Sequence, residues 1–179
     1  MVPEAPLELT KFGLRPGGEG WFVVNAREVR WRDTGSLGAF CDFEGKRRFS
    51  DFGINLNVLQ PGQPMSLYHR ENAQEAFLVL AGTCLLVVEG EERELKLWDL
   101  FHSPPGTEHV IVGAGAGPSV VLAVGARGRR RKGLVYPVSA VALKHGAGVR
   151  EEPTTPGEAY GSFASWKRSL YQEGWLPDL

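Results

Sequence analysis

Residues that could bind a metal gather in two short stretches of this sequence. The first holds His69, Glu71 and Glu75, and the second ends at His109, shortly after a Pro-Pro-Gly turn. On a strand, side chains two positions apart point to the same face, so His69 and Glu71 would project together. Two imidazoles and two carboxylates that meet at one point suit a divalent transition metal. We therefore predict one divalent ion (zinc, iron, manganese or nickel), bound by His69, Glu71, Glu75 and His109.

Glu71 has two possible roles at such a site. As a fourth ligand, its carboxylate would help to neutralise the cation. As a catalytic residue, it would act as a general base beside the metal. Gln74 could enter the site if the loop turns differently. His102 is expected to line the pocket rather than to bind the metal.

An interpretation without a metal is also available for these residues. In it, His69 and His109 are packed histidines, while Glu71 and Glu75 are exposed acids. Carboxylates and imidazoles inside an apolar barrel are costly without a counter-charge, and a divalent cation removes that cost. The joint spacing of the two stretches favours the metal.

Short strands would position these side chains. Apolar or alternating runs, separated by glycine and proline turns, occur at 65–69, 75–81, 83–88, 92–97, 100–103, 108–112 and 119–125. Many short strands at even spacing indicate an all-β sandwich or barrel. Within 53–59, the alternation places Asn55 and Asn57 on one face. We expect that face to be solvated or hydrogen-bonded, with the lining of a cavity as the alternative.

One helix is predicted near the end of the chain. Thr155 suits its N-cap, Pro156 suits its first position and Glu158 completes a capping box. Apolar residues then recur at helical spacing as far as Leu170, and Gly174 ends the element.

The two stretches resemble the two sequence motifs of the cupin family. The first motif is written G(X)5HXH(X)3–4E(X)6G and the second contains PXG(X)2H. The residues that carry the resemblance are Gly62, His69, Glu71, Glu75 and Gly82 for the first motif, and Pro104, Gly106 and His109 for the second. The resemblance covers residues 53–126.

This sequence departs from the cupin pattern in four places. One extra residue precedes His69, Glu71 replaces the second histidine, Trp98 replaces a glycine and Gly113 replaces an asparagine. An alternative register would place Tyr68 and Arg70 in the histidine positions and would leave His69 on the outer face. We prefer the register with His69 and Glu71 because it supplies ligands.

The resemblance implies a cupin-type β-barrel, or jelly roll, followed by a short C-terminal α-helix. Residues 1–52 would add N-terminal strands, 53–126 would form the cupin core, and 127–179 would pack a strand and the helix on the barrel. It also implies a metal-dependent enzyme that acts on a small oxygenated metabolite, as an isomerase, dioxygenase or lyase. The alternative is a non-enzymatic sensor or storage cupin that binds a small ligand or a metal.

Cupin barrels often pair through their sheets, and this chain has spare aromatic residues outside the motifs. They are Trp21, Phe22, Trp31, Phe163, Trp166 and Trp175. Surplus apolar surface of this kind marks an interface, so we predict a homodimer.

The composition limits the remaining possibilities. The chain has 179 residues, 42% of them hydrophobic, and a net charge of −1, as expected of one globular domain with no general affinity for nucleic acid. The basic run at 127–132 is expected to be a solvated loop. No apolar run approaches the length that spans a membrane, and the two cysteines fit a reducing cytoplasm. The expected partner is therefore a small molecule.

Overall fold

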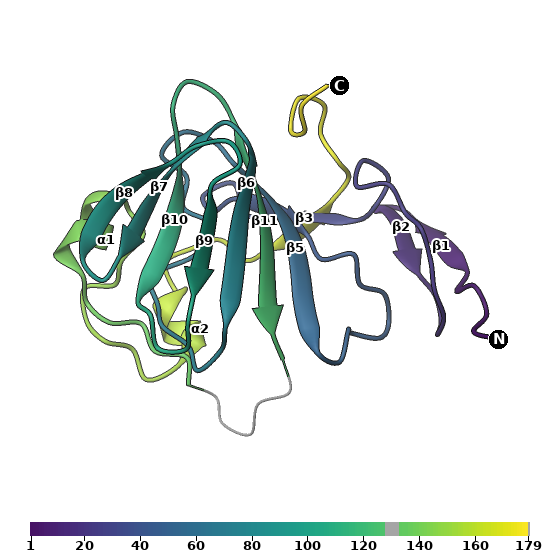
Figure 1. Cartoon of the computed structure of the whole chain (residues 1–179), viewed down its shortest axis with the longest axis horizontal. Coiled ribbons are helices and arrows are strands. Elements are labelled where there is room, and N and C mark those ends of the chain that lie inside the picture. Colours follow the sequence, from purple (N-terminus) through teal and green to yellow (C-terminus); the bar gives the residue numbers. More distant parts are fainter. Residues whose placement is uncertain (128–132, 179) are drawn as a thin grey trace.

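The computed structural model describes residues 1–127 and 133–178. Nearly all of its regular structure is antiparallel strand, and the strands form two larger sheets that face one another (Figure 1). The smaller of these has the order β10-β7-β8, and the larger has the order β12-β3-β4-β5-β11-β6-β9. The all-β, jelly-roll type of fold is therefore confirmed.

The strands of the larger sheet are β3 (Trp31–Asp33), β4 (Ala39–Cys41), β5 (Phe52–Leu59), β6 (Glu75–Ala81), β9 (Leu100–Ser103), β11 (Ser119–Ala126) and β12 (Lys167–Ser169). Those of the smaller sheet are β7 (Thr83–Val88), β8 (Glu91–Leu95) and β10 (His109–Ala114). A separate hairpin, β1 (Leu7–Thr10) with β2 (Gly13–Pro16), projects from one end of the molecule (Figure 1).

The inner faces of the two sheets share one apolar core. It contains Phe77 and Val79 from β6, Val121 from β11, Leu86 from β7 and Ile111 from β10, all nearly or fully buried. Alternate residues of each strand supply this core because side chains on a strand alternate between its two faces. The core holds the two sheets at a fixed separation, and this positions residues that come from different strands.

Two tight turns connect strands that carry the core. Gly82, between β6 and β7, has a φ of +69°, and a β-carbon there would lie 2.7 Å from the carbonyl oxygen of Pro118. Glu89 and Gly90 both have positive φ, which is the backbone that a two-residue β-hairpin favours.

The stretch 65–69 does not form the predicted strand. It makes one isolated bridge, between His69 and His109. Pro64, just before the stretch, bridges to Val112, and Arg70, just after it, bridges to Val135. Proline has no N–H to donate, and the chain changes partner between His69 and Arg70, so no continuous ladder can form. Part of the predicted motif strand is therefore a loop attached to the smaller sheet.

A short C-terminal helix is present where it was predicted, but its predicted extension to Leu170 was wrong. The helix α2 covers only Pro156–Ala159, although Thr155 caps it as predicted by accepting a hydrogen bond from the N–H of Glu158. Gly157 and Gly161 weaken a helix at this point. The chain instead continues as an extended segment to β12, which pairs with β3. A short helix that the sequence did not reveal, α1 (Ala140–Lys144), is capped by Ser139.

Trp31 explains why the extended path is preferred. Its side chain is fully buried, and the rings of Tyr171 and Trp175 pack against it with centroids 6.2 Å and 5.0 Å away. Burial of such large rings favours a chain path that brings both to β3, and this outweighs local helix propensity.

Three other expectations concern the two cysteines, the basic run and membrane-spanning helices. Cys41 and Cys84 are both free and buried, as expected of inert thiols. Most of the basic run, residues 128–132, lies outside the described residues. In the part of the chain that is described, no helix has the length and apolar character needed to cross a bilayer.

Candidate metal centre

His69, Glu75 and His109 come together at one end of the barrel. Glu75 is the first residue of β6 and His109 is the first residue of β10. The N–H of His109 donates to the carbonyl of His69 at 2.8 Å, and the N–H of His69 donates to the carbonyl of His109 at 3.1 Å. One potential ligand atom from each of the three side chains lies within 4.8 Å of the others.

The hydrogen bonds of both imidazoles leave Nε2 available as a ligand. Nδ1 of His69 lies 2.7 Å from the carbonyl oxygen of Leu67, and Nδ1 of His109 lies 3.1 Å from that of Thr107. A carbonyl can only accept, so each Nδ1 carries the proton and each Nε2 carries a lone pair. A backbone or side-chain partner on the other nitrogen is usual for metal-binding histidines because it fixes the tautomer.

Burial keeps both imidazoles neutral. It lowers the pKa of His69, and it lowers the pKa of His109 to about 4, where repulsion from a charged His69 contributes as well. A metal requires the neutral, unprotonated form of the ring. Both histidines are therefore in the ligand form at neutral pH.

The environment of His109 fits a cation. Its Nε2 atom is buried and has no hydrogen-bond partner among the described residues, while a carboxylate oxygen of Glu75 lies 3.4 Å away. A buried nitrogen lone pair facing a carboxylate is unfavourable, and a cation between them would compensate both. The three residues therefore fit a divalent metal.

Two phenylalanines surround His109. The rings of Phe77 and Phe101 contact its imidazole edge-on, with centroids 5.3 Å and 5.4 Å away. Ser103, the next residue on the inner face of β9, places its hydroxyl oxygen 3.4 Å from Nδ1 of His109. This shell limits the rotation of the imidazole.

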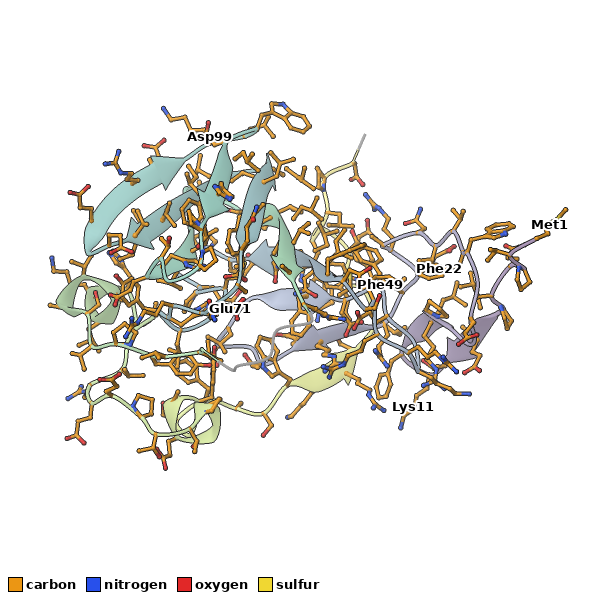
Figure 2. All side chains as sticks on the ribbon, turned by 60° about the horizontal axis from the view of Figure 1, so that its bottom comes forward. Met1, Lys11, Phe22, Phe49, Glu71 and Asp99 are labelled. Atoms are coloured by element: carbon orange, nitrogen blue, oxygen red, sulfur yellow. The ribbon has the colours of Figure 1, made fainter. Side chains whose placement is uncertain are left out.

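The other candidates from the sequence are placed differently. Glu71 is half-buried, and its charge acts on both His69 and Tyr136, but it is not part of the three-residue group. In Figure 2 Glu71 lies well apart from the N-terminal hairpin, where Lys11 is labelled. Gln74 and His102 are both exposed. Because Ser103 points inward, its neighbour His102 points out to solvent and does not line the pocket, contrary to expectation.

A cavity of about 190 Å³ opens beside His69 and Glu75. Its other described lining residues are Phe40, Asn55, Asn57, Met65, Ser66, Phe77, Ala123 and Trp166. The two asparagines of β5 therefore line a cavity, which was the alternative and not the preferred expectation. The Nδ2 atom of Asn57 also donates to the carbonyl of Val121 at 3.3 Å, so Asn57 both lines the cavity and is hydrogen-bonded.

Two tyrosines that sequence patterns did not indicate support the site. Tyr136 is buried, and its ring centroid lies 6.1 Å from that of His69. The hydroxyl of Tyr160 accepts a hydrogen bond from the N–H of Leu67 at 3.2 Å and is hydrogen-bonded to Tyr136 as well. Burial raises the pKa of both phenols, so both stay protonated at neutral pH. They are far from the histidines in sequence, and no spacing could have linked them.

Comparison with known proteins identifies the class. Residues 55–125 match the family described as the cupin domain. Together with the antiparallel jelly-roll fold, this match assigns residues 55–125 to a cupin domain. No significant match was found among proteins of curated function.

One solved structure shares the fold, and two others are similar over a little more than half of this chain. KdgF from a Halomonas species is 21% identical, with a TM-score of 0.51, over 61% of this chain and 96% of that one. A protein from Silicibacter pomeroyi, named as a sugar phosphate isomerase of the cupin superfamily, is 26% identical, with a TM-score of 0.48, over 57% of this chain and 71% of that one. A candidate sugar phosphate isomerase from Acidithiobacillus ferrooxidans is 26% identical with a TM-score of 0.47, and the match spans 52% of this chain and 61% of that protein.

Tyr160 supports His69 through Leu67, whose N–H donates to Tyr160 and whose carbonyl orients the imidazole. This contact leads to a stability prediction. In Tyr160→Phe the buried N–H of Leu67 loses its acceptor, which costs about 1–3 kcal/mol of unfolding free energy. Urea denaturation measures this cost. Tyr171→Phe is the control, because its hydroxyl accepts only a long bond of 3.4 Å from the tail residue Leu176. Equal denaturation midpoints for Tyr160→Phe and wild type would contradict the role assigned to Tyr160.

Proposed function

We propose that this protein is a metal-dependent enzyme that acts on a small oxygenated metabolite. One divalent metal ion would be held by His69, Glu75 and His109. The observation that carries the proposal is the approach of their ligand atoms to within 4.8 Å of one another beside a cavity. Zinc, iron, manganese and nickel all accept mixed imidazole and carboxylate ligands.

Three protein ligands leave room for a further one, which is the usual arrangement at catalytic metal sites. When bound, such an ion supplies Lewis-acid chemistry that polarises a carbonyl or hydroxyl group. The amide of Asn55 can donate a hydrogen bond to an oxygenated ligand. The side-chain carbonyl oxygen of Asn57 and the hydroxyl oxygen of Ser66 can accept one, since Nδ2 of Asn57 and the hydroxyl of Ser66 already donate to backbone carbonyls. The apolar side chains of Met65 and Phe77 exclude water from the other walls.

The second candidate function is non-enzymatic binding of a small ligand or a metal, as in sensor and storage cupins. One observation favours it. Of the described residues that line the cavity, only His69 and Glu75 have a basic or acidic side chain, and both are proposed as metal ligands. A general base would then have to come from outside the lining, and Glu71 is the carboxylate whose charge reaches His69.

Measurement of bound metal should distinguish the three proposed ligands from His102, the exposed histidine. Wild type should bind one metal per chain, whereas His109→Ala and Glu75→Gln should weaken binding by roughly a hundredfold or more. Glu75→Gln preserves side-chain volume, so a loss of metal there is not a consequence of misfolding. His102→Ala is the matched control and should retain its metal, because His102 faces solvent. Full metal content in both His69→Ala and His109→Ala would falsify the metal centre.

The substitution Glu71→Gln tests whether Glu71 is a metal ligand or a general base. We expect the variant to keep its metal, because Glu71 is not part of the three-residue group. If Glu71 is the general base, turnover of a substrate found by metabolite screening should fall about a hundred- to ten-thousand-fold. Glu94→Gln, on the exposed strand β8, serves as the control. Loss of metal from Glu71→Gln would instead make Glu71 the fourth ligand, and no change in either property would exclude both roles.

We also propose that the protein is a homodimer. Trp21 stays 52% exposed, and the side chains of Leu9 and Val23, which also belong to the N-terminal segment, are exposed too. Trp31 and Trp175, by contrast, pack against each other within the chain, so the apolar surface available for dimer formation is smaller than the sequence indicated. Light scattering at micromolar concentration should give the mass of two chains, and a monomer mass would contradict the proposal.

A further inference from the structure

Trp166 separates the cavity beside the metal centre from a second hollow. This second hollow has a volume of about 370 Å³, and its described lining is Leu37, Gly157, Tyr160, Gly161, Phe163, Ala164, Ser165 and Trp166. Trp166 is the only described residue that lines both spaces. We therefore take Trp166 as the wall between the two spaces.

Strand β12 and Phe40 hold this wall in place. Lys167, the residue after Trp166, pairs with Asp33 of β3. The indole packs edge-on against Phe40, with ring centroids 5.0 Å apart, and the guanidinium of Arg32 covers the Phe40 ring at 5.7 Å. Edge-to-face aromatic pairs and cation–π contacts both favour one orientation, so these contacts hold the indole at the boundary of the two spaces, where Trp166 stays 37% exposed.

The volumes of the two spaces indicate which ligands the wall would exclude. Pockets that enclose drug-sized ligands have volumes of about 300–1,000 Å³, and the cavity beside His69 and Glu75 is smaller than that range at about 190 Å³. Joined to the second hollow, it would fall well within the range. Four of the eight described lining residues of the second hollow are glycine, alanine or serine, which leaves space for a longer ligand.

We propose that Trp166 sets the upper size limit of the ligand. The ligand would be a short oxygen-donor molecule that reaches the metal with one end and meets the indole with the other. The walls suit this class, since Asn55, Asn57 and Ser66 offer hydrogen bonds near the metal while Phe40 and Trp166 offer apolar contacts farther out. This inference rests on the proposed metal centre, and it names Trp166 as a specificity-determining residue of that site.

Metal-chelating hydroxamates of two sizes test the proposal. Zinc-loaded wild type should bind acetohydroxamate, and it should bind 4-phenylbenzohydroxamate at least about tenfold more weakly, as measured by calorimetry. In Trp166→Ala, the affinity for the biphenyl compound should rise about tenfold or more, while that for acetohydroxamate should change by less than about threefold. Trp166→Phe, which keeps an aromatic wall of smaller size, should fall between the two. Trp98→Ala is the control, because Trp98 is 67% exposed and lines neither space.

The outcomes separate this inference from the metal centre itself. If zinc-loaded wild type binds neither hydroxamate, or retains no zinc, the metal centre is wrong and the inference fails with it. If wild type binds zinc and acetohydroxamate but Trp166→Ala and Trp166→Phe both leave the preference for the smaller compound unchanged, the metal centre stands and Trp166 does not set the size limit.

Discussion

The pair of backbone hydrogen bonds between His69 and His109 is the contact on which the rest of the site depends. Each residue donates its N–H to the carbonyl of the other, at 3.1 Å and 2.8 Å, and the two imidazole centroids lie 4.9 Å apart as a result. The residues that lead to His69 form a loop, so this bridge fixes where its side chain lies relative to β10. Glu75 then joins the two rings because β6 places it beside Ser103 of β9.

An unfavourable arrangement of polar groups at this point is the strongest physical argument for a cation. Two neutral imidazoles and a carboxylate face one another at the end of an apolar core, and His109 Nε2 is buried without a hydrogen bond among the described residues. Proteins seldom bury polar groups in this way unless something compensates them. The carbonyls of Leu67 and Thr107 orient both rings so that their lone pairs point away from the backbone, which suits a metal and would serve no purpose in a merely packed histidine pair.

The local sequence patterns predicted the strands and the grouping of His69, Glu75 and His109, because a period of two and a Pro-Pro-Gly turn are local signals. They failed where distant residues decide the structure. The helical spacing from Ala159 to Leu170 was real, yet packing of Tyr171 and Trp175 on Trp31 drew that segment into an extended path. Trp166, Tyr136 and Tyr160 reach the site only through that path and through the segment after β11. No spacing rule connects them to residue 69.

The most direct measurement of the central claim is anomalous X-ray scattering from crystals of the protein loaded with zinc, recorded on both sides of the zinc absorption edge. The account predicts one anomalous peak per chain, about 2.0–2.2 Å from Nε2 of His69, Nε2 of His109 and a carboxylate oxygen of Glu75. A fully loaded protein whose peak lies elsewhere, with His69 and His109 unligated, would contradict it.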